Sequence, residues 1–208
     1  MLRLYTPARV ESIIKKYDPV IRKICRKYGL PPAVIKAVLY TEMIRVALLD
    51  IAADLAVRMG AFFKRDSSTG YAQIYGYVAI NAANFAADRG IASYASLGLG
   101  RQRRRLDPKS PADVRKVWLK IHRDPAANME FAALNLLSCA EEMTGRIDFE
   151  GYTPEELKLI LSRYNGNVKW ITSYGEEAYG HYQRYLSRRT KKITLYNTNT
   201  NPRRKQDG

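Results

Sequence analysis

One acidic residue, Glu42, interrupts an otherwise apolar helical stretch of the sequence. It is the only charged residue between Lys36 and Arg45. Apolar residues share its face at helical spacing, namely Ile35, Val38, Leu39, Val46 and Leu49. A carboxylate on such a face loses hydration, which raises its pKa toward neutrality, and an acid still protonated there can serve as a general acid. The alternative is a buried glutamate in an ion pair with Arg45, Arg58 or another arginine.

Three segments in chain order accompany this glutamate. Residues 28–43, YGLPPAVIKAVLYTEM, place a Gly-Leu-Pro turn ahead of the helix that carries Glu42. Residues 67–74 (SSTGYAQI) form a polar turn cluster, and residues 161–166 read LSRYNG. In type and order, the three segments resemble the lytic transglycosylase and goose-type lysozyme superfamily. A weaker fourth match, residues 124–128 (DPAAN), is similar to the start of the helix behind the cleft in that superfamily.

The resemblance covers roughly residues 26–186 and implies a lysozyme-like multi-helix domain. We therefore expect a mainly α fold with at most a small β element near residues 68–77. The implied activity is cleavage of the β-1,4 bond between N-acetylmuramic acid and N-acetylglucosamine in peptidoglycan, with Glu42 as acid and base and no cofactor or metal. Met43 stands where the superfamily usually has serine, and the interval from Glu42 to Gly70 is longer than usual. Lytic transglycosylase and muramidase chemistry therefore both stay open.

A second carboxylate would separate these two reactions, because glycoside hydrolysis usually uses two acidic residues. Asp66 is the best candidate, since goose-type lysozymes carry an aspartate in a similar place that positions the attacking water. The alternative for Asp66 is a loop aspartate that binds nearby backbone N–H groups. Asp50 and Asp54 fall on a continuous helix predicted over residues 33–59. On such a helix they would lie about 12 and 18 Å from Glu42, too far for joint chemistry.

The same resemblance implies a set of substrate-binding residues. Gln73 would hydrogen-bond sugar hydroxyl or N-acetyl groups, and Ser68 would orient Glu42 or contact the sugar. Tyr71 lies near the expected cleft, where aromatic rings stack on pyranose rings. Tyr164 would face Glu42 and hydrogen-bond the carboxylate through its phenol, while Asn165 would shape the turn beside it. For each residue the alternative is an ordinary structural role in a turn or in the core.

The length and charge of the chain predict its organisation and partners. The 208 residues suffice for a single domain over residues 1–189, followed by a basic and flexible tail over residues 190–208. Lys and Arg number 35 against 20 Asp and Glu, for a net charge of +15. Such a surplus favours polyanionic partners. If the protein cleaves peptidoglycan, these partners are the peptidoglycan strands and the anionic polymers of the cell wall.

Two other functions fit part of these observations. Residues 101–124 contain nine Lys or Arg and three Asp, which suits a basic helical protein that binds nucleic acid. A lysozyme-like scaffold that binds glycan without cutting it would keep the fold and lose the activity. The first 30 residues carry too many charges for a secretory signal, and no stretch is long and apolar enough to span a membrane. We therefore expect synthesis in the cytoplasm and action at the bacterial wall, as a phage endolysin or a delivered effector.

Local patterns predict several further features. Asp18 and Pro19 are typical of a helix start, so a new helix is expected there after one over residues 10–17. Thr153 and Glu156 form a capping-box pattern ahead of a helix over residues 153–163. Further helices are expected around residues 91–97 and over residues 175–189. Cys25 and Cys139 stand among apolar residues and are expected to be buried thiols, and the two histidines are too isolated to bind a metal.

Overall fold

The computed structural model describes residues 3–47, 52, 54–55, 57–59, 66–102, 104–166 and 168–199, with side chains up to residue 188. Seven α-helices occupy these ranges: α1 (Pro7–Tyr28), α2 (Pro32–Arg45), α4 (Gly76–Asp88), α5 (Pro111–Arg123), α6 (Pro125–Thr144), α7 (Pro154–Asn165) and α8 (Ser173–Asn199). The prediction of a mainly α fold is confirmed. Within the described chain, none of the helices has the length and apolar character needed to cross a bilayer.

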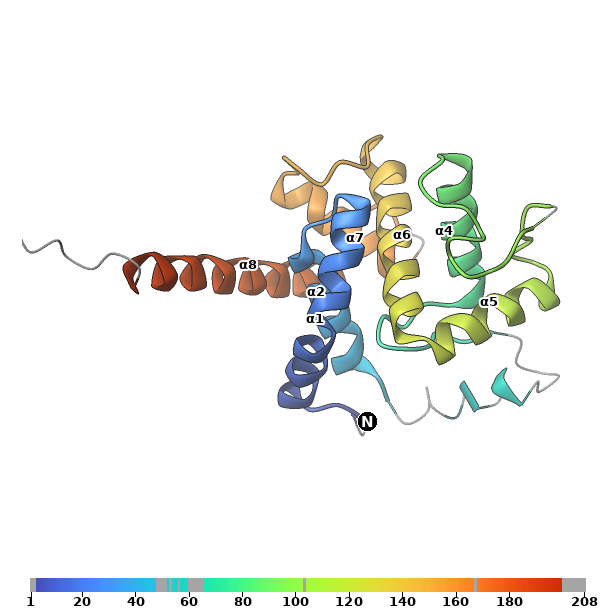
Figure 1. Ribbon diagram of the computed structural model, residues 1–208, viewed down its shortest axis with the longest axis horizontal. Helices are drawn as coiled ribbons and strands as arrows, with labels where there is room; N and C mark the ends of the chain where they lie inside the picture. Colours follow the sequence, from blue (N-terminus) through green and yellow to red (C-terminus); the bar gives the residue numbers. More distant parts are fainter. Residues whose placement is uncertain are drawn as a thin grey trace, which may run out of the picture.

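Helix α6 forms the centre of the fold. It stands between α1, α2 and α7 on one side and α4 and α5 on the other (Figure 1). Its side chains are buried nearly all round, as expected for a helix enclosed by others. Helix α2 is similarly apolar and packs against α1, α6 and α8. The helix that carries Glu42 is therefore fixed on several sides.

Helix α1 is one continuous helix, so the predicted helix start at Asp18 is wrong. Thr6 caps its first turn by accepting a hydrogen bond from the Arg9 amide, and Pro19 lies inside the helix. An interior proline loses one backbone hydrogen bond and costs about 3 kcal/mol. Apolar residues buried along the whole of α1 offset this cost. Asp18 does not cap a helix, because its carboxylate forms ion pairs with Arg22 and Lys36.

Helix α2 ends at Arg45, which corrects the prediction of one helix over residues 33–59. Val46 is extended, with φ −58° and ψ 128°, and Ala47 pairs with Arg3 in an antiparallel bridge. The separations derived for a straight helix therefore do not apply. Asp50 lies outside the described residues, whereas Asp54 lies in a helical segment beyond the break.

Three later helices start in the same way, with a side-chain cap followed by a proline. Ser110, Asp124 and Thr153 each cap a helix whose first residue is a proline, and each side chain accepts backbone N–H bonds. Thr153 and Glu156 form both bonds of the predicted capping box. Residues 91–97 are turns, so the helix predicted there is wrong.

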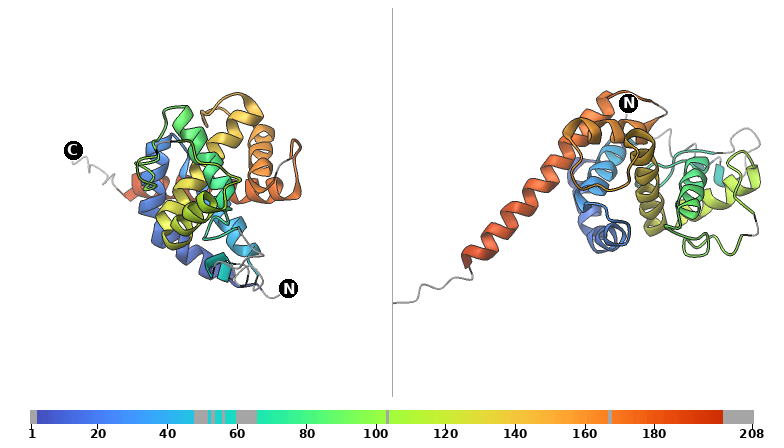
Figure 2. Two further views of the ribbon diagram at one scale, coloured as in Figure 1. Left: turned by 90° about the vertical axis from the view of Figure 1, so that its right-hand side faces the viewer. Right: turned by 90° about the horizontal axis from the view of Figure 1, so that it is seen from above.

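The last helix, α8, is longer than predicted. Its first half packs against α2 and α7, and it then projects away from the body of the molecule (Figures 1 and 2). It continues to Asn199, ten residues past the predicted end of that helix at residue 189. The predicted boundary at residue 190 therefore falls within α8, and residues 200–208 lie outside the described chain.

Candidate active site

A tight turn beside α4 forms one wall of the candidate site. Thr69 and Ile74 form an isolated antiparallel bridge, which is the small β element expected near residues 68–77. Gly70 has a φ of +72°, and a Cβ there would lie 2.4 Å from Nδ2 of Asn128. Asn128 is fully buried; its Nδ2 donates to the Thr69 carbonyl and its Oδ1 accepts from the Ala72 amide, both at 2.9 Å. One side chain of α6 thus holds this turn in place.

Two predicted substrate-binding residues face the cavity from this turn. The Ser68 hydroxyl donates to Oε1 of Gln73 at 3.1 Å, and the side-chain amide of Gln73 donates through Nε2 to the Gly70 carbonyl at 2.7 Å. Gln73 has a φ of 44°, which makes it the one non-glycine residue of the described chain in the left-handed region. The turn is therefore held by specific contacts at the point where it meets the cavity.

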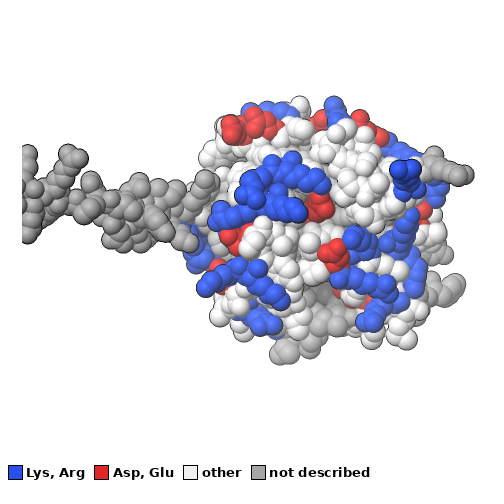
Figure 3. Space-filling view, in the orientation of Figure 1, with Lys and Arg blue, Asp and Glu red and all other residues white. Residues whose placement is uncertain are grey.

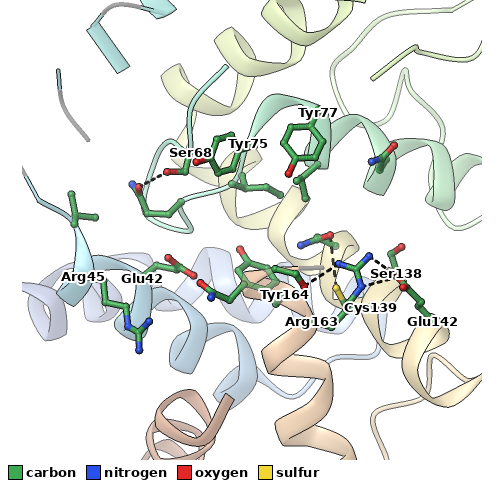
Figure 4. A pocket seen from close by; sticks show the side chains of 18 residues that line it. Glu42, Arg45, Ser68, Tyr75, Tyr77, Ser138, Cys139, Glu142, Arg163 and Tyr164 are labelled. Carbon is green, nitrogen blue, oxygen red and sulfur yellow. Dashed lines mark hydrogen bonds and ion pairs between the residues drawn. The ribbon is translucent and has the colours of Figure 1, made fainter. Parts of the chain in front are cut away.

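The cavity has a volume of about 590 Å³ and runs between the turn, α2, α6 and α7. Figure 4 shows Glu42 at one end and the pair Arg163–Glu142 at the other. Five of the predicted site residues line it: Glu42, Ser68, Gln73, Tyr164 and Asn165. Three segments far apart in the sequence thus meet around one space, in the combination that the motifs predict.

Glu42 is a partly buried acid at the end of this cavity. Its Oε1 accepts a hydrogen bond of 2.6 Å from the phenol of Tyr174, a residue only 1% exposed. Burial raises the pKa of Glu42 to about 7, and the Tyr174 hydrogen bond and the Arg45 charge offset part of this rise. Burial and the nearby Glu42 also raise the pKa of Tyr174 well above its usual value, so its phenol stays protonated and keeps donating. A substantial share of Glu42 is therefore protonated at neutral pH.

The alternative of an ion pair between Glu42 and a neighbouring arginine does not describe this site. Nη2 of Arg45 lies 2.5 Å from Oε2 of Glu177 on α8, and the guanidinium stacks 4.9 Å from the centre of the Tyr174 ring. The ion pairs found in the described chain do not include Glu42. Arg45 is thus held by α8 although it lines the same cavity.

Tyr164 faces the cavity, but its phenol has a different partner from the one expected. It donates a hydrogen bond of 2.9 Å to the Ala72 carbonyl, which ties α7 to the turn. Tyr174 fills the role expected of Tyr164. The two rings come from different helices, and no motif around residue 174 marks it, because its partner Glu42 lies 132 residues away in the sequence.

The carboxylate of Asp66 lies at the start of α4. Its two carboxylate oxygens accept the amides of Gly76 and Tyr77 at 2.8 and 2.9 Å. A carboxylate is well placed there, because the first amides of a helix lack partners and carry partial positive charge. Asp66 is not among the described residues that line the cavity. These two bonds are those expected of a backbone-binding loop aspartate, and the role of Asp66 as a second carboxylate stays a prediction.

We expect Asp66→Ala to lower the free energy of unfolding by about 1–2 kcal/mol, because two helix amides lose their acceptor. The glycan cleavage expected from the motifs should stay, per folded molecule, close to that of the wild type. Urea unfolding at pH 7, together with an activity assay, measures both quantities. A large loss of turnover with unchanged stability would show that Asp66 takes part in catalysis.

Tyr71 and Asp54 border a different cavity from the one that holds Glu42, so the structure does not bring Tyr71 together with Glu42 in one cavity. Tyr71 packs against Tyr17, with ring centres 5.6 Å apart, and borders a separate cavity of about 240 Å³. The Asp54 carboxylate accepts the hydroxyls of Ser67 and Thr69 at 2.6 and 2.7 Å. These contacts fix the outer face of the turn.

Besides the predicted site residues, several others line the cavity. Tyr75 and Tyr77 stand on its rim, 41% and 45% exposed, with ring centres 5.6 Å apart. Arg163 and Glu142 form an ion pair of 2.8 Å at the far end. In the part of the chain that the structure describes, Glu42 and Glu142 are the carboxylates that line the cavity. Glu42 is therefore the one among them without an arginine partner.

Cys139 also lines the cavity, yet it is not a reactive group. It is 3% exposed, and burial raises the pKa of its thiol to about 12. Cys25 is likewise buried and free. The expectation of buried thiols is thus confirmed for both cysteines.

The positive charge is dispersed over the surface. Lys and Arg side chains spread across the face shown in Figure 3, with Asp and Glu between them. Within the basic stretch over residues 101–124, Arg104, Arg105 and Lys120 form ion pairs with aspartates. This stretch therefore offers fewer free cations than its composition suggests.

Comparison of the chain with family models, with curated proteins and with solved structures finds no match.

Proposed function

We propose that this protein is an enzyme that cleaves the glycan strands of peptidoglycan at the β-1,4 bond between N-acetylmuramic acid and N-acetylglucosamine. One observation carries the proposal, namely a partly buried carboxyl group, Glu42, at the end of a cavity, with its pKa raised to about 7. Such a group is a proton donor near neutral pH and a base after the proton has left. Its cavity is lined by amide, hydroxyl and tyrosine groups of the kind that bind sugars.

The geometry suggests which oxygen acts. Tyr174 holds Oε1 of Glu42, which leaves Oε2 to carry the proton into the cavity. This proton passes to the glycosidic oxygen as its bond to C1 of the muramic acid breaks. The resulting carboxylate then takes a proton either from the 6-hydroxyl of the same sugar, which closes an anhydro ring on C1, or from a water that attacks C1.

We favour the first of these routes, that of a lytic transglycosylase. Hydrolysis usually needs a second carboxylate, and the two candidates among the described residues are engaged elsewhere. Asp66 binds the start of α4, and Glu142 is paired with Arg163. A single glutamate suffices for the intramolecular route.

The polar wall of the cavity suits a substrate with N-acetyl and hydroxyl groups. Ser68, Gln73 and Asn165 offer hydrogen-bonding groups near Glu42, and the exposed rings of Tyr75 and Tyr77 provide flat surfaces for pyranose rings. The net charge of +15 favours attachment to the anionic polymers of the wall. On this proposal the enzyme acts at the bacterial cell wall, after release from or delivery by the cell that makes it.

Digestion of purified peptidoglycan, with the products identified by mass spectrometry, tests this proposal. Muropeptides one water lighter than the reducing-end products would identify the transglycosylase reaction. Ordinary reducing ends would identify a muramidase and would call for a second catalytic group. If the wild type binds the glycan but releases nothing, the protein is a non-catalytic glycan-binding scaffold and not an enzyme. If it binds only nucleic acid, with steep salt dependence, the basic-module alternative holds.

A further inference from the structure

Helix α8 supplies an acidic residue, Glu177, at the edge of the candidate active site. Its carboxylate holds the guanidinium of Arg45, which lines the cavity. Tyr174, one turn earlier on α8, hydrogen-bonds Glu42. A single face of α8 thus contacts both Glu42 and the cation nearest to it.

We propose that Glu177 is a positioning residue for Glu42, a role that rests on the proposed function. Glu177 keeps the Arg45 guanidinium in an ion pair with α8 and away from the Glu42 carboxylate.

The spacing on α2 makes this arrangement necessary. Arg45 follows Glu42 by three residues, and side chains at that spacing are neighbours on a helix. An arginine there would pair with the glutamate if nothing else held it, and a paired carboxylate gives up its proton more readily. The side chains of Arg45 and Glu177 are 39% and 38% exposed, and exposed ion pairs of this kind contribute little to stability. Stability alone therefore does not account for the pair.

Among the described residues, the other ionisable groups that face Glu42 and Glu177 are compatible with this role. Tyr164 from α7 and Tyr174 from α8 face Glu42, and burial raises the pKa of both phenols well above the usual value, so neither carries charge. His181 lies 3.8 Å from Glu177, and burial lowers the pKa of its imidazole below its usual value. It is neutral at pH 7 and leaves the Glu177 carboxylate to Arg45.

Removal of the Glu177 charge should therefore act on Glu42 through Arg45. In Glu177→Gln the guanidinium loses its anionic partner and keeps its contact with the Tyr174 ring, from which it can turn toward Glu42. The Glu42 carboxylate is then stabilised, and the pKa of Glu42 falls from about 7 toward its ordinary value. Fewer molecules carry the catalytic proton at pH 7.

The test is a pH titration of the Glu42 side chain by NMR in the full chain, with the signal assigned by its loss in Glu42→Gln. We expect the midpoint to fall by about one pH unit in Glu177→Gln, the lower end of the effect of a close opposite charge. The double variant Arg45→Gln/Glu177→Gln should return the midpoint to the wild-type value or above it, because the freed cation is gone. Glu177→Asp should keep it near the wild type.

Glu176→Gln is the matched control, because Glu176 is the next residue on α8 and pairs with Lys158 at 3.1 Å. It should leave the Glu42 midpoint unchanged. Turnover at pH 7 should drop roughly fivefold in Glu177→Gln, in line with the smaller protonated fraction, and recover as the pH is lowered. A merely structural role would lower the melting temperature and leave the titration where it is.

The inference is overturned if the Glu42 midpoint is the same in the wild type and in Glu177→Gln, or if the double variant fails to restore it. This readout needs no substrate, so it is separable from the proposed function. A shifted midpoint in a protein that releases no muropeptides would overturn the proposed cleavage activity and keep the positioning role of Glu177. Cleavage by a protein whose Glu42 midpoint does not shift in Glu177→Gln would keep the proposed activity and overturn the positioning role of Glu177.

Discussion

Replacement of Glu42 by glutamine is expected to reduce the rate of peptidoglycan cleavage by about 10³-fold, within the range that a positioned general acid contributes. Glutamine keeps the size of the side chain, and its carbonyl oxygen still accepts the Tyr174 hydrogen bond. It lacks the proton that must reach the glycosidic oxygen. Release of soluble muropeptides from purified walls measures the loss.

The control for this substitution is Glu155→Gln, the same chemical change at an exposed residue in the first turn of α7. It should cleave like the wild type. A Glu42→Gln protein that retains more than a tenth of the activity would exclude Glu42 as the acid.

A stability measurement separates lost chemistry from lost structure in Glu42→Gln. The folded-state pKa of Glu42, about 7, lies above its ordinary value of 4.5, so the folded protein binds the proton more tightly than the unfolded chain. The wild type is therefore destabilised as pH rises from 4.5 to 7, and the loss is complete above 7. Glutamine removes this cost, and we expect Glu42→Gln to be more stable than the wild type by about 3 kcal/mol at pH 8.

Gly70→Ala is expected to lower the free energy of unfolding by about 3 kcal/mol or more. Alanine is strained at a φ of +72°, and its Cβ would lie 2.4 Å from Nδ2 of Asn128. Asn128 would have to move, and its two buried hydrogen bonds to the turn would break. Since Ser68 and Gln73 lie on this turn, cleavage should fall as well. Urea unfolding gives the stability, and the muropeptide assay gives the activity.

Gly145 offers a matched control for this prediction. It also has a positive φ, +73°, at the end of α6, but a Cβ there would meet nothing within 4 Å. Gly145→Ala should therefore cost only the backbone strain, about 1 kcal/mol. Equal losses in the two variants would show that the contact with Asn128 does not hold the turn.

The sequence predicted the parts of the site that depend on local pattern. The apolar face around Glu42 correctly indicates a partly buried acid, because helical spacing decides which residues of α2 share that face. The turn formers of residues 67–74 indicate the small β element, and Thr153 with Glu156 indicates the start of α7. Each of these features is set by residues within a few positions of one another.

The errors arise where distant contacts decide. Pro19 stays inside α1 because a buried apolar face outweighs its local cost, and α2 stops at Arg45 although the residues that follow are equally apolar. Tyr174 reaches Glu42 from α8. Spacing along the chain carries no information about which helix will lie opposite.

The most direct test of the central claim, that Glu42 is the proton donor, is the pH dependence of cleavage by the wild type and by Glu42→Gln. Because the protonated form is the active one, the wild-type rate should be highest below pH 7 and fall tenfold per pH unit above it, through a single ionisation near 7. The residual rate of Glu42→Gln should show no such ionisation. A wild-type rate that stays constant from pH 6 to pH 9, or a variant that keeps the same fall near pH 7, would contradict the account.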